Sequence, residues 1–136
     1  MKLHPNFVLE TCLYAEDLQA CEAFYTNILG LELYSKDAHR HLFFRCGHGM
    51  FLLFKPDVTQ RSHSTVPPHG AMGPGHVAFA IPPESIDRWR EHLQNHGIAI
   101  ETEIGWPSGG HSIYFRDPAG NSIELATPQT WDKPGE

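Results

Sequence analysis

The chain has few cysteines, no excess of positive charge and no cysteine pair of the CxxC type. Its three cysteines, Cys12, Cys21 and Cys46, cannot all pair with one another, so the sequence predicts neither a disulfide framework nor a thiolate zinc site. The formal net charge of -6 at pH 7 opposes contact with a nucleic-acid backbone or an anionic membrane surface. We therefore expect a small-molecule partner, with no nucleic acid and no membrane.

Long apolar runs are also missing. The longest aliphatic and aromatic run, MFLLF at residues 50–54, is far too short to cross a bilayer, and the opening segment MKLHPNFVLE lacks the apolar stretch of a signal peptide. Together with the cysteine pattern, this predicts a cytoplasmic protein. The 136 residues, of which 40% are hydrophobic, are enough for one globular domain with a core of its own.

The pattern of apolar residues and glycines predicts the same order of elements twice. In the first half, a strand over residues 7–15 precedes a helix that begins at Asp17 and ends before Gly30, and three short strands follow. Residues 56–74 are rich in proline and are expected to form a linker. In the second half, the segments HVAFAI, PESIDRWREHLQNHG, IAIETEI, HSIYFR and NSIELAT predict a strand, a helix and three more strands.

The two halves can be superimposed by eye. Gly30 and Gly97 each close a helix, LFFR at residues 42–45 corresponds to IYFR at 113–116, and both halves end in a strand that runs into proline, FLLFKP and IELATP. The sequence thus predicts an α+β fold made of two βαβββ modules, at about residues 7–55 and 75–128. Each module is too small to stand alone, so the two are expected to share one structure.

Three segments, EDLQACEAFYTNILGLEL, GHVAFAI and YFRDPAGNSIEL, resemble the vicinal oxygen chelate (VOC) superfamily. This superfamily includes glyoxalase I, fosfomycin-resistance proteins, methylmalonyl-CoA epimerase, extradiol dioxygenases and bleomycin-resistance proteins. The resemblance extends to about Pro128. It implies that residues 1–136 form a single VOC domain with a curved mixed sheet, and that the chain forms a homodimer with sites shared between chains.

Superposition of the modules also shows which residues occupy equivalent positions on the first and last strand of each module. Glu10 falls opposite His76, and Glu124 falls opposite Leu52 when the closing prolines are matched. Because side chains alternate along a strand, His76 shares a face with Ala78 and Ala80, while Glu124 shares a face with Ser122 and Ala126. Small neighbours on these faces predict the wall of a cavity.

The resemblance implies a metal site, because superfamily members bind a metal through residues of these strands and Glu10, His76 and Glu124 stand at the matching positions. Two carboxylates and an imidazole that converge in a cavity are stabilised by a divalent cation. A ligand set with two carboxylates is chemically harder, in the hard–soft sense, than the two-histidine, one-carboxylate set of extradiol oxygenases. The identity of the metal stays open among Zn, Ni, Mn, Fe and Mg. Glu10 or Glu124 is expected to act as the catalytic base.

Other residues are candidates for contact with substrate. Ser112 and Tyr114 share a face of the strand before Glu124, and the resemblance implies substrate contact for Tyr114, as in fosfomycin-resistance proteins. Packing of this tyrosine at a sheet edge is the structural alternative. Trp106 and His111 flank the Gly109–Gly110 loop and are expected to cover the cavity. The remaining histidines of interest are expected to be solvated: His39, His41, His63, His69, His92 and His96.

A metal with three protein ligands favours a glyoxalase-like lyase or isomerase, acting on a small substrate that chelates the metal through vicinal oxygens. Three alternatives stay open. The chain could be a fosfomycin-resistance-like transferase that opens a chelated epoxide, an extradiol-type dioxygenase, or a non-catalytic binding protein of the bleomycin-resistance kind, which sequesters an antibiotic or metabolite.

Overall fold

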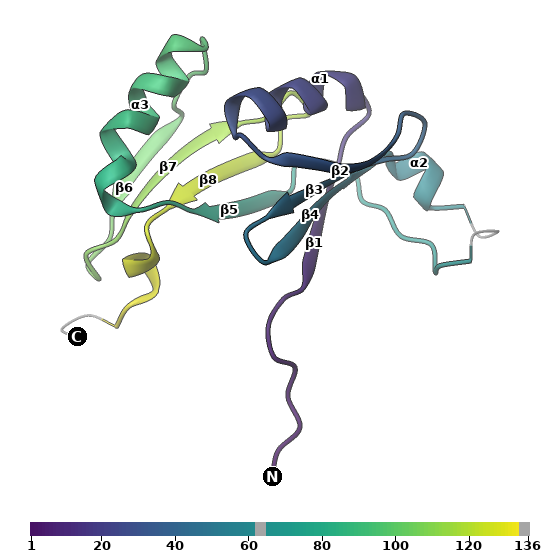
Figure 1. The fold of residues 1–136 in the computed structure, drawn as a ribbon, viewed down its shortest axis with the longest axis horizontal. Helices are drawn as coiled ribbons and strands as arrows, with labels where there is room; N and C mark the ends of the chain where they lie inside the picture. Colours follow the sequence, from purple (N-terminus) through teal and green to yellow (C-terminus); the bar gives the residue numbers. More distant parts are fainter. Residues whose placement is uncertain (62–64, 134–136) are drawn as a thin grey trace. The chain divides into compact units, whose positions relative to one another are not determined.

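The computed structural model describes residues 1–61 and 65–133, and the chain divides into two units, Met1–Met72 and Gly73–Glu136 (Figure 1). Each unit holds one four-stranded mixed sheet with a helix on one face, so the expected α+β fold of two βαβββ modules is confirmed. Part of the expected linker, with His63, lies outside the described residues. Among the described residues, no helix has both the length and the apolar content needed to traverse a bilayer.

Unit 1 contains the first module. Its strands pair in the order β1-β4-β3-β2, in which β1 and β4 are parallel and the other pairs are antiparallel. The elements are β1 (Glu10–Tyr14), α1 (Leu18–Ala23), a π-helical turn (Phe24–Ile28), β2 (Glu32–Asp37), β3 (His41–Cys46), β4 (Gly49–Phe54) and α2 (Pro56–Thr59). Asp17 caps α1 as predicted, since its side chain accepts a hydrogen bond from the Ala20 N–H.

Unit 2 repeats this arrangement. Its strands pair in the order β5-β8-β7-β6, again with a parallel first pair. The elements are β5 (His76–Ala80), a 3₁₀ turn (Pro83–Ser85), α3 (Ile86–Asn95), β6 (Thr102–Gly105), β7 (His111–Arg116), β8 (Ser122–Ala126) and a 3₁₀ turn (Pro128–Trp131). Gly97 follows α3 with a φ of 71°, and Gly30 has a φ of 69° after the first helix, so both glycines end their helices in the left-handed conformation.

The strand registers make the two units equivalent residue by residue. In unit 1, Glu10 pairs with Met50 and Cys12 with Leu52. In unit 2, His76 pairs with Ser122 and Ala78 with Glu124. Glu10 is therefore the counterpart of His76, and Leu52 is the counterpart of Glu124, as the superposition of the two halves predicted.

Each sheet buries one face against its own helix. The core of unit 1 is aromatic, with Tyr25, Phe44 and Phe51 fully buried. The core of unit 2 is mainly aliphatic, with Leu93 of α3 and Ile123 and Leu125 of β8 fully buried. Ile123 and Leu125 face away from Glu124 along β8, because side chains alternate along a strand. Glu124 therefore lies on the sheet face opposite the helix.

The structure differs from the sequence prediction in several places. Residues 7–9, expected to open the first strand, precede β1, which begins only at Glu10. Residues 56–59, expected to be linker, form the short helix α2, because Pro56 is well suited to the first turn of a helix. Residues 98–101, expected to be strand, are not part of β6, which begins only at Thr102. Glu101 nonetheless donates its backbone N–H to the Tyr114 carbonyl, so the chain already runs alongside β7 there.

Candidate metal and substrate site

His76 and Glu124 form the centre of the candidate site in unit 2. They come from the adjacent parallel strands β5 and β8, and His76 Nε2 lies 3.2 Å from Glu124 Oε1. The glutamate is buried, with 7% of its surface exposed, whereas half of the histidine side chain (51%) is open to solvent. A buried carboxylate thus faces an imidazole that a ligand can reach.

The orientation of the His76 ring is fixed by the backbone. Its Nδ1 lies 3.0 Å from the carbonyl oxygen of Ser122, the residue that pairs with it in the parallel ladder. A carbonyl accepts a hydrogen bond, so Nδ1 carries the proton. Nε2 is then the ring nitrogen that faces the Glu124 carboxylate. A backbone carbonyl bound to the other ring nitrogen is the second-shell arrangement typical of metal-binding histidines.

Glu124 is also held from its other side. Ser112 on β7 donates its hydroxyl to Glu124 Oε2 at 2.5 Å, and the indole N–H of Trp106 donates to the Ser112 oxygen at 2.8 Å. Ser112 is fully buried. The chain from Trp106 through Ser112 to Glu124 therefore positions one carboxylate oxygen and leaves the other directed at His76.

Tyr114 completes this side of the cluster. It is the direct cross-strand partner of Glu124, and its ring lies nearly parallel to that of His76, with centroids 6.3 Å apart. Burial, the negative charge of Glu124 and a hydrogen bond to that carboxylate raise the pKa of the Tyr114 hydroxyl. The phenol stays protonated at neutral pH and is available as a donor.

Small residues surround the pair. Ala78 is opposite Glu124 in the ladder, and Ala80 and Ala126 continue the same face. Ala78 and Ala80 are both exposed. The two alanines thus leave the face beside His76 open to solvent.

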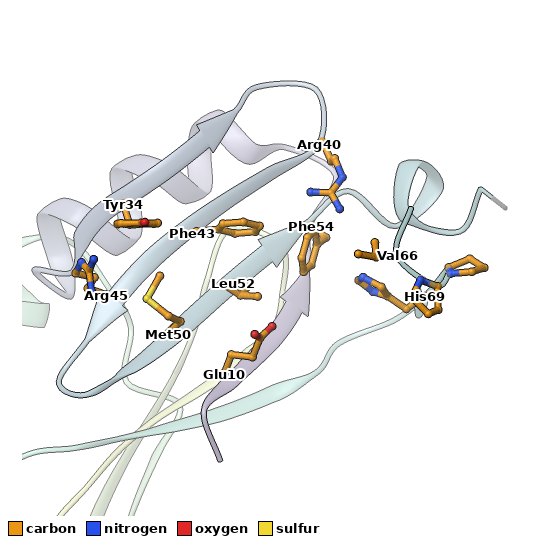
Figure 2. A pocket seen from close by; sticks show the side chains of 12 residues that line it. Glu10, Tyr34, Arg40, Phe43, Arg45, Met50, Leu52, Phe54, Val66 and His69 are labelled. Atoms are coloured by element: carbon orange, nitrogen blue, oxygen red, sulfur yellow. The ribbon is translucent and has the colours of Figure 1, made fainter. Parts of the chain in front are cut away.

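Glu10 lies in unit 1, at the start of β1, with an exposed side chain. It lines a pocket on the β1, β3 and β4 face of that unit (Figure 2). None of the described residues forms a hydrogen bond or an ion pair with its carboxylate. Within either unit, the described residues contain no group of three or more metal-binding side chains.

His111 does not join Glu124. Its neighbour Ser112 points to the cluster, and alternation along β7 sends His111 to the opposite face, where its Nε2 lies 2.7 Å from Glu103 Oε1. Arg90 of α3 also donates to Glu103. The structure therefore places His111 in an ion-pair network between the sheet and its helix, while Trp106, the other loop residue, does reach the cluster.

Two histidines that were expected to be solvated are structural. His69 lies 2.6 Å through Nδ1 from the Tyr14 hydroxyl and packs edge-on against Phe54, and His41 stacks on Phe43 with centroids 3.9 Å apart. Both are only partly exposed. Their sequence context, a turn and a proline-rich segment, gave no sign of these contacts, because the partners are distant in sequence or lie on a strand face.

The donor set in unit 2 suits a divalent cation. The His76 Nε2 and the Glu124 Oε1, 3.2 Å apart, are close enough to share a proton or a cation. Imidazole nitrogen and carboxylate oxygen both bind Zn, Ni, Mn and Fe. The two residues present in unit 2 therefore fit a metal, and they fill only part of the coordination sphere of such an ion.

The chain is similar to known proteins in sequence and in fold. The profile of the Glyoxalase/Bleomycin resistance protein/Dioxygenase superfamily matches residues 7–125. The crystal structure of a lactoylglutathione lyase from Agrobacterium tumefaciens is 41% identical, with a TM-score of 0.90 over 93% of this chain and 97% of that one. A glyoxalase/bleomycin resistance protein/dioxygenase from Nocardioides is 26% identical, with a TM-score of 0.74 over 99% and 91% of the two chains.

The chain is also similar to a transferase. The glutathione transferase FosA from Serratia marcescens is 29% identical over 113 residues, which cover 83% of this chain and 74% of the relative.

Proposed function

The chain belongs to the Glyoxalase/Bleomycin resistance protein/Dioxygenase superfamily, and from this premise we propose that it is a metal-dependent, glyoxalase-like lyase or isomerase. Its substrate is a small molecule that carries two neighbouring oxygens. The observation that carries the proposal is the oriented pair in unit 2, in which Nε2 of His76 lies 3.2 Å from the buried Glu124 carboxylate. The 41% identity to a lactoylglutathione lyase supports the reaction class.

In this proposal His76, Glu124 and Glu10 hold the metal. When bound, the metal acts as a Lewis acid that polarises the substrate carbonyl and stabilises developing negative charge. The Ser122 carbonyl orients His76, and Ser112 orients Glu124. These two ligands are therefore fixed before substrate arrives, which is what preorganised electrostatic stabilisation requires.

Proton transfer falls to a carboxylate. Glu124 Oε2 is engaged by Ser112, whereas Glu10 has no described partner and is exposed, so Glu10 is the better base. The base takes the proton alpha to the polarised carbonyl and returns it to the neighbouring carbon, so the reaction needs no outside oxidant or reductant. Tyr114, which stays protonated, donates to an oxygen of the substrate.

The test measures metal content and turnover in parallel. Purified protein is expected to retain close to one divalent ion per chain and to convert the hemithioacetal of methylglyoxal and glutathione. His76→Ala and Glu124→Gln are expected to lose metal and activity together, whereas Glu10→Gln loses activity with a smaller loss of metal. Glu32→Gln, at an exposed strand start in β2, is the control and keeps both. Full activity in the metal-free protein would rule the proposal out.

The match to FosA favours one alternative, the opening of a chelated epoxide by a thiol. In that reaction the thiolate sulfur bonds to an epoxide carbon, the carbon–oxygen bond breaks, and the released alkoxide takes a proton. Incubation with fosfomycin and glutathione distinguishes the two reactions. Formation of the glutathione adduct without conversion of the hemithioacetal would assign the chain to the transferase class.

We also propose a homodimer in which Glu10 of one chain serves the His76–Glu124 pair of the other. Phe7, Val8 and Leu9, which precede β1, are 62–79% exposed, and such an apolar segment is typical of a contact surface. An equal mixture of Glu10→Ala and His76→Ala chains, refolded together, is expected to regain about a quarter of native activity, because half of the dimers are mixed and each holds one intact site. No recovery in mixed dimers would place each site within one chain.

A further inference from the structure

Unit 1 holds a pocket of about 740 Å³ on the sheet face that corresponds to the His76–Glu124 face of unit 2 (Figure 2). This volume lies within the range of small-molecule sites, roughly 300–1,000 Å³. Its floor is apolar and consists of Phe43 on β3 and Met50, Leu52 and Phe54 on β4. Where unit 2 has the carboxylate of Glu124, this pocket has Leu52, so its floor is suited to holding an apolar group.

The aromatic floor leaves a flat surface. The Phe43 and Phe54 rings meet edge to face with centroids 5.5 Å apart, and His69 closes the same end against Phe54 at 4.8 Å. The Tyr14 hydroxyl fixes His69 through its 2.6 Å contact with Nδ1. A planar ring placed on this surface gains both apolar burial and edge-to-face contact.

Arg40 stands at this end of the pocket in a fixed position. Its guanidinium lies 5.2 Å from the centre of the Phe54 ring, and one of its nitrogens donates to His41 Nδ1 at 2.7 Å. Burial and the adjacent arginine charge lower the pKa of His41, which keeps that imidazole neutral and able to accept. The Arg40 guanidinium is thus held by the Phe54 ring and by His41 Nδ1, and its other N–H groups can donate to a ligand.

No described carboxylate forms an ion pair with Arg40 or with Arg45, the second arginine of the pocket. Arg45 lies over the Tyr34 ring at 4.4 Å, at the far end of β3, five residues from Arg40 (Figure 2). At about 3.3 Å per residue the two cations are on the order of 15 Å apart, too far for one small acid group to reach both. Glu10 adds one negative charge to the lining.

We propose that this pocket binds a small aromatic carboxylate, with its ring on Phe43, Leu52 and Phe54 and its acid group on Arg40. The planar guanidinium matches a carboxylate with two parallel hydrogen bonds. A single negative charge suits the pocket better than the two charges of a phosphate monoester, since Glu10 opposes additional negative charge. This inference goes beyond the proposed function, because the pocket includes neither His76 nor Glu124 and shares only Glu10 with the proposed metal site.

Calorimetric titration of the full chain in EDTA tests the proposal with three probes: 1-naphthoate, the neutral 1-naphthalenemethanol and 1-naphthyl phosphate. We expect 1-naphthoate to bind at least about tenfold more tightly than the alcohol, as expected for a charge-assisted pair, and more tightly than the phosphate. Arg40→Met removes the preference over the alcohol. Arg45→Met, the matched control, leaves it within about threefold. Equal binding of acid and alcohol, tighter binding of the phosphate, or a preference that survives Arg40→Met would overturn the proposal.

Two further measurements separate this proposal from the metal-dependent reaction. His76→Ala lacks the metal ligand but keeps every residue of the pocket, so it is expected to bind 1-naphthoate like the native chain. Loss of binding in this variant would contradict a site confined to unit 1. In native protein, backbone amide shifts caused by 1-naphthoate are expected on β3, β4 and residues 65–69. Shifts centred on β7 and β8 would place the ligand in unit 2. Because this measurement uses native protein, its result does not depend on whether Arg40→Met folds.

Discussion

A single hydroxyl, that of Ser112, connects the loop residue Trp106 to the buried carboxylate of Glu124. The serine is fully buried, so no bulk water replaces it if it is removed. Its position beside Glu124 follows from alternation along β7, whereas the hydrogen bond from Trp106 depends on the loop geometry. The residue acts through Glu124 and is a positioning residue.

Ser112→Ala is expected to lower the free energy of unfolding by about 1–3 kcal/mol, because it removes one hydrogen bond from the buried Glu124 carboxylate and the acceptor of the Trp106 indole N–H. Urea unfolding measures this loss. Metal affinity, followed by titration, is expected to weaken as well, since Glu124 is no longer held. Ser112→Thr, which keeps the hydroxyl, is the control; an equal loss in both variants would mean that packing and not the hydrogen bond matters.

The lowered pKa of the Glu103 carboxyl makes the stability of the protein depend on pH. Hydrogen bonds from Arg90 and then His111 hold the pKa of this carboxyl below its ordinary value of 4.5. A lowered pKa in the folded state stabilises the protein above the unfolded value, and this stabilisation is lost as pH falls through the folded pKa. Native protein is expected to lose more stability than Glu103→Gln on acidification below about pH 4.5 in thermal unfolding. Parallel profiles for the two proteins would contradict this role.

At the scale of elements, one side chain joins the turn before β8 to the start of β5. Asn121, buried in that turn, accepts the Gly75 N–H at 2.8 Å and donates to Asp117 at 3.0 Å. Gly75 immediately precedes His76. The hydrogen bonds of this turn therefore fix where the strand that carries His76 begins.

Asn121→Ala is expected to lower the free energy of unfolding by about 2 kcal/mol, since it leaves the Gly75 N–H and the buried Asp117 short of partners. Hydrogen exchange is expected to speed up at the start of β5 more than in β6. Asn27→Ala, on an exposed site of the first helical segment, is the control and changes neither quantity by much. Unchanged exchange at Val77 would show that β5 does not depend on this contact.

The elements themselves were largely predictable, because their signals are local. Asp17 and Gly30 mark the ends of the first helix through backbone preferences that need no distant partner. The equivalence of Glu10 with His76 followed from the repeat and reappears in the strand registers. The pocket in unit 1 could not be predicted, since it combines Arg40 from a turn with His69 from the segment after α2, and no sequence pattern relates the two.

At the scale of the whole molecule, bound metal is expected to raise stability by mass action. A ligand that binds only the folded state at a concentration 100 times its Kd adds about 2.7 kcal/mol. Thermal unfolding with and without Ni, Mn or Zn measures this increase in the native chain. The double variant His76→Ala, Glu124→Gln is expected to show almost none. An equal increase in both proteins would mean that the ions bind elsewhere, for example at other histidines.

The matching registers of the two sheets have a consequence for redesign. Two ladders of one pattern give each position of one unit a counterpart in the other, and the side chain at one position can differ from that of its counterpart. Leu52 on β4 and Glu124 on β8 are such a pair. Leu52→Glu would therefore place a carboxylate in the first unit at the ladder position where the second unit already carries one.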